Sequence, residues 1–421
     1  MTKPSMLTAQ QALDHLLSHA KPVAEAESIP MQASLGRVLA ENVNSLVDVP
    51  PLDNTSMDGY AVRTADTQNS GSILRIAQRI PAGSVGTTLE PGTAARIFTG
   101  APVPLGADAV VMQEDCTTPE NTSDQVQVNT VPTAGQWIRR RGEDLTTGKT
   151  ALTAGSYLRP QELGVAASAG LTHLKVKRRV RVAAFFTGDE LSLPGEPLKP
   201  GGIYNSNRDT LLACLKSLGC DATDLGIVPD RLDATRAALR KASKDHDLII
   251  TSGGVSVGEE DHIKPAVTAE GRLDLWQIAI KPGKPLAFGA VRKSDEPKDG
   301  EAWFIGLPGN PVSSFVTFLL FVRPFILKLQ GREAKLPQSY LMRADFDWLK
   351  ADRRNEFLRV KLNSNGGLDL FPNQSSGVLT SASWGDGLVD CPPNLPIKAG
   401  DLVKYIPVSY THLTLPTKRI V

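Results

Sequence analysis

Residues Leu248–Asp261 read LIITSGGVSVGEED, a short apolar run followed at once by a loop of glycines, serines and acids. In α/β enzymes such a loop follows a buried strand and presents backbone N–H groups to a phosphate or another oxyanion. Glycine lets the main chain approach a ligand closely. The acids at 259–261 offer the oxygen ligands that a hard cation such as Mg²⁺ prefers. The segment therefore predicts a strand that ends in an anion-binding loop.

Two further loops of the same kind follow at Lys281–Pro285 (KPGKP) and Gly306–Pro311 (GLPGNP). Because proline fixes φ, the first loop holds Lys281 and Lys284 at a low entropic cost, which suits binding of an oxyanion. A solvated turn is the alternative for this loop taken alone. The three loops follow one another closely along the chain, and together they favour a single anion site.

Strands and helices are expected to alternate from Val180 onward. The expected strands are Val180–Phe186, Ala222–Val228, 247–251, Leu286–Phe288 and Ala302–Ile305, and the expected helices are Asp209–Leu218, 233–244, a segment after Asp261, and a long helix capped by Asn310 with Pro311 at its first position. Such alternation predicts an α/β fold with a doubly wound, mainly parallel sheet and helices on both faces. Ligands of such sheets lie at the carboxyl ends of the strands, where these loops are found.

Acidic residues recur after the expected strands. Asp189 and Glu190 follow the first strand, Asp230 follows the second, and Asp261 follows the third. An acid placed at a helix N-terminus, where the helix dipole favours it, explains any one of these positions alone. Their repetition at one edge of a sheet favours Mg²⁺ held by two or three of these carboxylates beside phosphate groups.

The segments that flank this region differ from it in character. Residues 46–141 are rich in Pro, Gly, Thr and Val and predict a small, mostly β insertion, and residues 331–407 predict another small β domain. Residues 8–20 predict an amphipathic helix. Its His15 and His19 are expected to face solvent rather than to bind zinc.

Two motifs inside the insertion allow a plain structural interpretation. The run Arg139–Arg141 precedes Glu143 and Asp144, and a solvated face of ion pairs is favoured there over a phosphate contact. Asp58 lies in a turn-like segment and is consistent with an ordinary Asx turn. Neither motif identifies a site by itself.

Composition narrows the classes of function. A net charge of +1 over 421 residues provides no basic field for nucleic acid, and the length predicts roughly three domains. The 4 cysteines form no Cys-x-x-Cys pair and are expected to be free thiols in a reducing compartment. No secretory signal is expected, and polar residues interrupt the apolar run Val312–Leu327, which favours a buried helix over a membrane span. These features predict a cytoplasmic protein with no nucleic-acid or membrane partner.

The last residues look foreign to the chain. The segment 408–421 reads VSYTHLTLPTKRIV, which matches one translated frame of a sequencing-library adapter. We expect it to be a non-native tail and leave it out of the fold prediction, and a genuine short tail is the alternative.

Taken together, the motifs resemble one enzyme family. In chain order they are Asp53–Arg63 (DNTSMDGYAVR), Thr99–Pro104 (TGAPVP), Arg139–Asp144 (RRRGED), Thr187–Leu191 (TGDEL), Thr251–Asp261, Lys281–Pro285 and Gly306–Ser313 (GLPGNPVS). This order closely resembles that of the MoeA family, the molybdopterin molybdenumtransferases to which the E domain of gephyrin also belongs. The resemblance spans roughly residues 5–407.

The resemblance implies an elongated homodimer and a four-domain subunit. The implied domains are a discontinuous linking domain at 5–45 and 142–177, the β insertion at 46–141, an α/β molybdopterin-binding domain at 178–330, and a C-terminal β-barrel at 331–407. The implied reaction consumes adenylylated molybdopterin and molybdate with Mg²⁺ and yields molybdenum cofactor and AMP. Molybdopterin adenylyltransferase and apo-molybdoenzymes become possible partners.

The resemblance also assigns residues to the site. Lys281, Lys284 and Ser313 should contact molybdate, with Ser256 and Asp261 nearby, and Arg359 and Ser376 match positions near it. Glu190, Asp230 and Asp261 should serve the metal–pyrophosphate region, and Asp58 and Thr99 should reach the site from the partner subunit. The remaining substrate-binding candidates are Ser252, Gly253, Gly254, Pro308, Asn310 and Arg139. Gln277 departs from the family pattern, which often has a basic residue there, and this weakens one expected charge contact.

Other functions remain open at this stage. A molybdopterin adenylyltransferase would be a single domain of about half this length. A non-catalytic scaffold, as in gephyrin, would have the same fold without catalysing the reaction. A molybdopterin carrier would bind the pterin without turnover.

Overall fold

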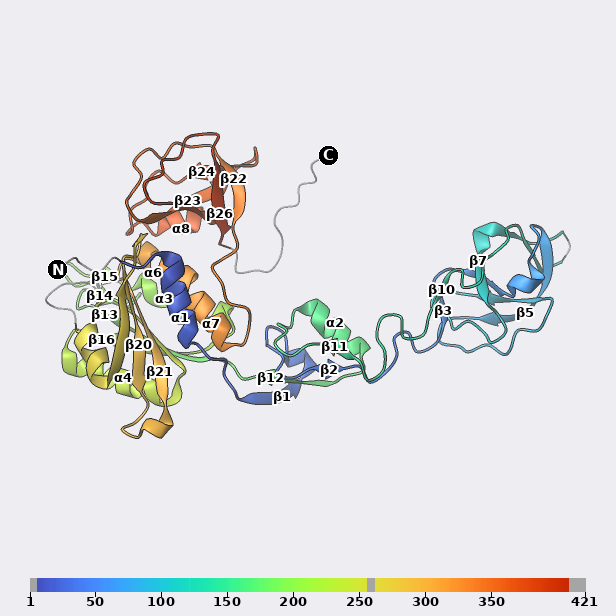
Figure 1. Ribbon diagram of the computed structural model, residues 1–421, viewed down its shortest axis with the longest axis horizontal. Helices are drawn as coiled ribbons and strands as arrows, with labels where there is room; N and C mark the ends of the chain where they lie inside the picture. The colour runs from blue at the N-terminus through green and yellow to red at the C-terminus, as the bar shows by residue number, and fades with distance from the viewer. Residues whose placement is uncertain (1–5, 121, 256–261, 409–421) are drawn as a thin grey trace. The chain divides into compact units, whose positions relative to one another are not determined.

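The computed structural model describes residues 6–120, 122–255 and 262–408, which form two compact units. One unit contains the chain up to Glu25 and again from Lys177, and the other is Ala26–Val176. Figure 1 shows the elements of both units.

The first unit is built on a six-stranded sheet of order β16-β13-β17-β21-β20-β18. Its strands are β13 (Arg181–Thr187), β16 (Asp221–Val228), β17 (Leu248–Ser252), β18 (Gly271–Gln277), β20 (Pro285–Arg292) and β21 (Glu301–Leu307). The first four strands in the sheet order are parallel, and β20 runs antiparallel to both of its neighbours, β21 and β18, so that β18 points in the same direction as the first four. The sheet is therefore mixed, and β18 is a strand that the sequence pattern did not predict.

Helices cover both faces of this sheet. They are α1 (Ala9–His19), α3 (Ser206–Ser217), α4 (Leu232–Asp245), α5 (Ile263–Glu270), α6 (Pro311–Thr317) and α7 (Arg323–Leu329), with a π-helical turn at Phe318–Val322 between the last two. Val182 and Phe186 of β13 pack in one core cluster with α1, α3, α6 and α7, while Ala183 and Phe185 pack in another with α4 and α5. Successive strand residues point to opposite faces, so β13 is buried on both sides. The predicted doubly wound α/β fold is confirmed.

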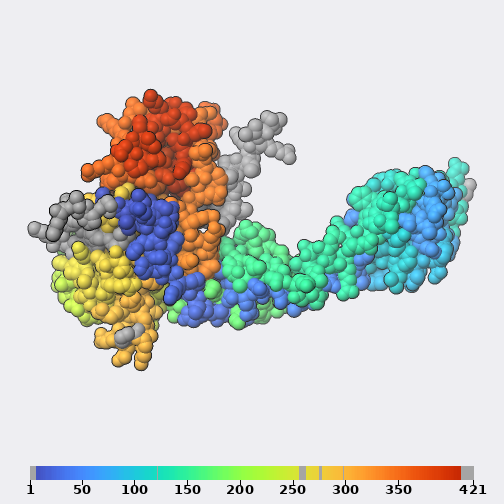
Figure 2. All heavy atoms as spheres, in the orientation of Figure 1, coloured from blue at the N-terminus to red at the C-terminus, as the bar shows by residue number. Residues whose placement is uncertain are grey.

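The N-terminal helix is part of this core. Figure 2 shows the dark-blue atoms of α1 against the yellow and orange atoms of the same unit. Leu13 and Leu16 are fully buried. The expectation that His15 and His19 face solvent is wrong, because both half-buried rings pack edge-on against Phe288 at centroid distances of 6.0 and 5.6 Å.

One helical segment, Pro311–Leu329, is long and apolar enough to cross a membrane, with a mean hydropathy of 1.7. However, 89% of its apolar window is buried inside the protein. Because its apolar side chains already pack on the sheet, we assign it as a core helix.

The first unit also contains a small barrel. Its strands are β22 (Tyr340–Ala344), β23 (Asn355–Leu362), β24 (Gly367–Leu370), β25 (Gly387–Cys391) and β26 (Leu402–Pro407), with helix α8 (Thr380–Trp384). Pairing of β23 with β25 closes these strands into a barrel, as predicted. One further strand, β19 (Ile280–Lys281), joins β23 in parallel although it comes from the KPGKP region. A short pair, β14 (Leu191–Ser192) and β15 (Ile203–Tyr204), completes the unit.

The second unit is mostly β. Its six-stranded sheet has the order β7-β4-β6-β5-β9-β8. These strands are β4 (Gly59–Val62), β5 (Ser72–Ile80), β6 (Thr93–Ile97), β7 (Ala109–Met112), β8 (Cys116–Thr117) and β9 (Gln125–Val128). Smaller pairs join β1 (Ala26–Pro30) with β12 (His173–Lys177), β2 (Val43–Asn44) with β11 (Thr150–Leu152), and β3 (Asn54–Thr55) with β10 (Ile138–Arg139), beside helix α2 (Pro160–Ser168).

Candidate functional site

Four parallel strands end at one edge of the α/β sheet. Thr187 pairs with Val228, Phe186 with Ser252, and Ser252 with Leu307. The segments that leave this edge are Gly188–Glu190, Pro229–Asp230, Gly253–Gly254 and Pro308–Asn310. The structure thus brings together loops that are far apart in the sequence, at the edge where α/β sheets bind ligands.

Asn207 at the start of α3 ties two of these loops together. Its Nδ2 donates to Ser252 Oγ at 2.9 Å and to the carbonyl of Gly309 at 2.7 Å. The Ser252 hydroxyl in turn donates to the carbonyl of Pro308 at 2.9 Å, and Ser314 donates to Ser252 at 3.4 Å. Sequence analysis missed Asn207, because an Asn at a helix start ordinarily indicates only a cap.

The glycine pair at the end of β17 is required by its backbone conformation. Gly253 and Gly254 have φ of +99° and +63°. A Cβ on Gly253 would lie 2.3 Å from the carbonyl oxygen of Thr187, and one on Gly254 would lie 2.9 Å from Thr187 Oγ1. Glycine is therefore needed for this close approach. Thr187 Oγ1 is buried and has no hydrogen-bond partner among the described residues, so a polar atom remains available under the loop.

Carboxylates gather at the same edge. The N–H of Asp230 lies 3.4 Å from Asp189 Oδ1, which joins the loops after two neighbouring strands. The carboxylate of Glu190 folds back over Gly188, where a Cβ would lie 2.6 Å from its Oε2. Oxygen donors of this kind suit Mg²⁺. The described residues contain no group of three His, Cys, Asp or Glu side chains placed to hold a metal ion. The third expected ligand, Asp261, lies outside the described residues, as does Ser256.

The KPGKP loop packs on α6. Gly283 has φ of +110°, and a Cβ there would lie 2.4 Å from Thr317 Oγ1 and 3.5 Å from the carbonyl oxygen of Ser313. The Ser313 side chain is buried, while Lys284 is exposed and makes no ion pair with any residue that the structure describes. The Lys284 ammonium is therefore open to a ligand. Gln277 pairs with Pro285 at the base of this loop.

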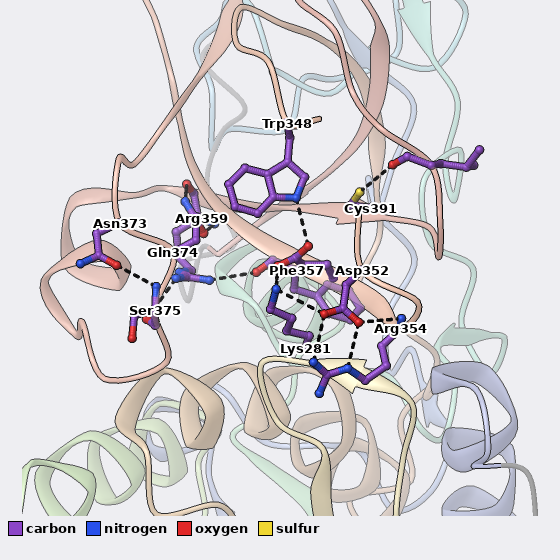
Figure 3. Close-up of polar contacts among 12 residues, drawn as sticks. Lys281, Trp348, Asp352, Arg354, Phe357, Arg359, Asn373, Gln374, Ser375 and Cys391 are labelled. Carbon is purple, nitrogen blue, oxygen red and sulfur yellow. Dashed lines mark hydrogen bonds and ion pairs between the residues drawn. The ribbon is translucent and has the colours of Figure 1, made fainter. Parts of the chain in front are cut away.

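Lys281 is held by carboxylates of the barrel. Its Nζ lies 2.8 Å from Glu356 Oε1 and 3.4 Å from Asp352 Oδ2 (Figure 3). Burial alone would lower the pKa of Lys281, but the hydrogen bonds and charges of Glu356 and Asp352 outweigh it and raise the pKa. The two lysines of the loop thus differ, with one ammonium paired and the other free of described partners.

Arg359 is a buried cation with neutral partners. It is 2% exposed and donates to Ser381 Oγ at 3.1 Å. It also donates to the carbonyls of Phe357 and Ser375, both labelled in Figure 3, at 3.2 Å each. Burial lowers the pKa of Arg359 to about 10, and the charge of Glu356 opposes that shift. No described carboxylate lies within ion-pair distance of its guanidinium, so its charge is not neutralised by a direct partner.

The barrel loop that binds Arg359 also touches the start of α6. The carbonyl of Ser376 accepts the N–H of Val312 at 3.0 Å, one residue before Ser313. Asn310 is exposed and precedes the helix without a side-chain cap bond. Through these contacts the structure places Ser313, Ser376 and Arg359 along one boundary between the α/β sheet and the barrel.

The second unit holds the remaining candidates. Asp58 Oδ1 accepts the N–H of Thr99 at 2.8 Å and its hydroxyl at 2.7 Å. Both side chains are exposed. These two hydrogen bonds, from the N–H first and then the hydroxyl, lower the pKa of Asp58, and the charge of Arg96 lowers it further. Asp58 is therefore an ionised, oriented carboxylate. Sequence analysis missed Arg96, which also donates to the carbonyl of Gly59 at 3.0 Å.

The arginine run divides into two roles. Arg140 pairs with Asp53 at 2.7 Å and Arg141 with Asp48 at 2.6 Å, as an ion-pair face predicts. Arg139 is exposed and makes no ion pair with a described residue. Only Arg139 therefore keeps a cation open to a ligand.

A separate hollow of about 260 Å³ lies at the opposite ends of the strands, beside Asp247 before β17 and Trp303 in β21. Arg178, which lines the hollow, donates hydrogen bonds of 2.7 and 2.9 Å to Asp247. Because these charges neutralise one another and the glycine loops are at the other edge, we do not assign the site to this hollow.

Three family descriptions match successive parts of the chain. Residues 7–170 match the MoeA N-terminal region (domain I and II), residues 183–328 match a probable molybdopterin binding domain, and residues 342–408 match the MoeA C-terminal region (domain IV).

Curated proteins named molybdopterin molybdenumtransferase resemble most of the chain. The protein from Haemophilus influenzae is 40% identical over 369 residues, which cover 87% of this chain and 89% of that protein. The one from Nostoc sp. is 37% identical, covering 84% and 80%. The one from Staphylococcus epidermidis is 30% identical, covering 96% of each.

Solved structures agree with the sequence comparisons. Two crystal structures of a molybdopterin biosynthesis MoeA protein from Pyrococcus horikoshii match with TM-scores of 0.82 and 0.77, at 27% and 29% identity. They cover 96% and 97% of this chain and 100% of the matched chains.

Proposed function

Because the chain belongs to the MoeA family and inserts molybdenum into molybdopterin, we propose that its substrates are adenylylated molybdopterin and molybdate, and that AMP is released. The observation that carries this proposal is the convergence of the loops after Thr187, Ser252 and Leu307 at one sheet edge. Glycine backbone, an open lysine and several carboxylates lie at this edge, as a phosphate-bearing substrate and an oxyanion require. The curated relatives are named molybdopterin molybdenumtransferase, and this name disfavours the alternatives of an adenylyltransferase or a scaffold.

The residues would share the work as follows. The backbone of Gly253 and Gly254 would bind the phosphate groups, because their conformation opens the loop to close approach. Lys284 would bind molybdate and orient it beside the pterin, so that insertion gains from proximity, and the buried charge of Arg359 would attract the anion. No side chain needs to form a covalent intermediate.

We propose that carboxylates at the strand ends hold Mg²⁺. Glu190 and Asp230, together with Asp261, would hold it, and their oxygens are the ligands this ion prefers. When bound, the ion would draw negative charge from the pyrophosphate and ease its cleavage. Glu190→Gln and Asp230→Asn should therefore raise the Mg²⁺ concentration needed for AMP release. Equal Mg²⁺ requirements in the variants and the parent would contradict this assignment.

We further propose that the protein acts as a homodimer in the cytoplasm, with Asp58 and Thr99 serving the partner's site. It would receive substrate from an adenylyltransferase and pass the cofactor to apo-molybdoenzymes. Mixing Asp58→Asn with Glu190→Gln, at an Mg²⁺ concentration at which neither variant releases AMP alone, would test this arrangement. Random exchange in a two-fold dimer would regenerate about a quarter of the intact sites, whereas action within one chain would regenerate none.

The defining experiment uses purified protein with adenylylated molybdopterin, Mg²⁺ and molybdate. We expect AMP release that depends on molybdate and a product that activates an apo-molybdoenzyme. A carrier without turnover would bind the pterin and release no AMP, and that result would overturn the proposed reaction.

A further inference from the structure

The ion pair between Lys281 and Glu356 joins two parts of the proposed site. The Glu356 side chain is only 3% exposed, while that of Lys281 is 38% exposed, so the lysine reaches from the open loop to a buried carboxylate. The pair follows from strand pairing, because β19 adds to the barrel beside β23 with Lys281 opposite Glu356. The contact is therefore built into the backbone register.

The carboxylates of this cluster are fixed from the barrel side. Glu356 Oε2 accepts the indole N–H of Trp348 at 3.0 Å (Figure 3). Asp352 accepts two bonds from the Arg354 guanidinium, at 3.0 and 3.1 Å, and the Arg354 N–H at 3.0 Å. Lys281 has three ammonium donors on a flexible stem and contacts these two carboxylates at 2.8 and 3.4 Å, and no described group outside the cluster forms an ion pair with it. The ammonium is thus the movable partner of the cluster.

We propose that Glu356 is a positioning residue that holds Lys281 when the site is empty and competes with molybdate for its ammonium. A carboxylate and an oxyanion make the same kind of charge-assisted hydrogen bond to a lysine. The buried negative charge of Glu356 also repels an arriving dianion in a region of low dielectric. Glu356 therefore weakens molybdate binding while it keeps Lys281 oriented for the reaction. This inference rests on the proposed function, in which the KPGKP loop binds molybdate.

The proposal predicts opposite effects on affinity and turnover. Glu356→Gln keeps the shape of the side chain and removes its charge, so the KM and Kd for molybdate should fall on the order of threefold to tenfold. The kcat should fall as well, because the ammonium loses its fixed partner. A purely structural ion pair would behave differently, since its loss would weaken or leave unchanged the binding of molybdate.

Two controls separate this effect from loss of a nearby charge. Asp390 lies on β25 opposite Phe357 and binds the Asn355 amide at 2.6 Å, so Asp390→Asn removes a barrel charge without touching Lys281. We expect Asp390→Asn to leave both the affinity for molybdate and the kcat unchanged. In a Lys281→Gln background, Glu356→Gln should tighten molybdate binding less than it does in the parent, because the competition for the ammonium is gone and only the repulsion remains.

The experiment uses the full chain, with molybdate titrated calorimetrically and AMP release measured at varied molybdate. Circular dichroism confirms folding of each variant. If Glu356→Gln does not fold, Asp352→Asn replaces it, with the same sign expected because Asp352 is the second carboxylate on Lys281. Tighter binding with lower kcat supports the proposal. Unchanged or weaker binding, or equal tightening in the Lys281→Gln background, overturns it.

Failure of the underlying function would look different. If the parent protein neither bound molybdate nor released AMP in its presence, the proposed reaction would fail before any variant was compared. If the parent is active and Glu356→Gln binds molybdate less tightly, only the competition fails.

Discussion

A single oxygen of Asp58 accepts two hydrogen bonds from Thr99, at 2.8 Å from the N–H and 2.7 Å from the hydroxyl. The two residues come from different loops of the second unit, so the contact fixes one loop against the other. Because both bonds favour the charged form, they lower the pKa of Asp58. The pair thus presents an ionised carboxylate of fixed orientation on an exposed surface.

Thr99→Val should raise the pKa of Asp58 part of the way to its ordinary value, because the hydroxyl bond is lost and the larger N–H contribution remains. Since the folded-state pKa lies below the unfolded one, Asp58 stabilises the fold above the unfolded pKa, and this stabilisation is lost as pH falls through the folded pKa. Carbon-13 NMR titration of the Asp58 carboxyl measures the shift. An unchanged pKa in the variant would show that the hydroxyl contributes nothing.

Gly253→Ala should damage the loop after β17. The new Cβ would lie 2.3 Å from the Thr187 carbonyl oxygen, and φ is already +99°. We expect a loss of about 2–4 kcal/mol in unfolding free energy and of most AMP release. Gly195→Ala is the matched control, because Gly195 has φ of +94° with nothing within 4 Å of its Cβ position. It should cost about 1 kcal/mol and leave activity intact. Chemical denaturation compares the two, and equal losses would show that the close approach does not matter.

Asn207→Ala should separate the loops that follow β17 and β21. It removes the donor that binds Ser252 Oγ at 2.9 Å and the Gly309 carbonyl at 2.7 Å. We expect a stability loss of about 1–3 kcal/mol and a larger proportional loss in kcat/KM. Asn42→Ala, which removes one bond to the Ala154 N–H at 2.8 Å in the other unit, should leave kcat/KM unchanged. Kinetics like those of the parent for Asn207→Ala would show that the loops after β17 and β21 keep their positions without the Asn207 side chain.

Arg359 offers a test of charge against packing. Both Arg359→Lys and Arg359→Met lose the planar set of bonds to Ser381, Phe357 and Ser375, so both should lose about 1–3 kcal/mol of stability. Only the lysine keeps a cation for molybdate, and it should retain at least about tenfold more activity than methionine. Arg343→Met on the barrel surface, which breaks a pair with Asp345, is the control. Equal activity in the two Arg359 variants would show that the positive charge of this side chain does not contribute to the reaction.

The sequence predicted those parts of the fold that depend on local pattern. Alternation of apolar runs with helices predicted that the loops after Thr187, Ser252 and Leu307 share an edge, because carboxyl ends of parallel strands must coincide. It did not predict β18 or the antiparallel direction of β20, since direction depends on the connections between strands and on pairing partners distant in the chain.

The residues of the candidate site likewise include some that local sequence predicted and some that only the tertiary structure reveals. Glycines 253 and 254 were predicted as loop residues from their own conformational freedom. The pairing of Lys281 with Glu356 was not, because it arises only when β19 joins a barrel strand 75 residues away in the sequence. Asn207 was missed for a related reason, since its partners come from β17 and β21 and nothing in its neighbourhood on α3 indicates them.

The central claim is that separate loops of the first unit form one oxyanion site at the carboxyl edge of the sheet. Anomalous diffraction at the tungsten edge, from crystals of the protein with tungstate and molybdopterin, tests it most directly. We predict a tungsten peak within hydrogen-bonding reach of Lys284 Nζ, near the start of α6. A peak confined to the hollow beside Arg178 and Asp247, at the other end of the strands, would contradict it.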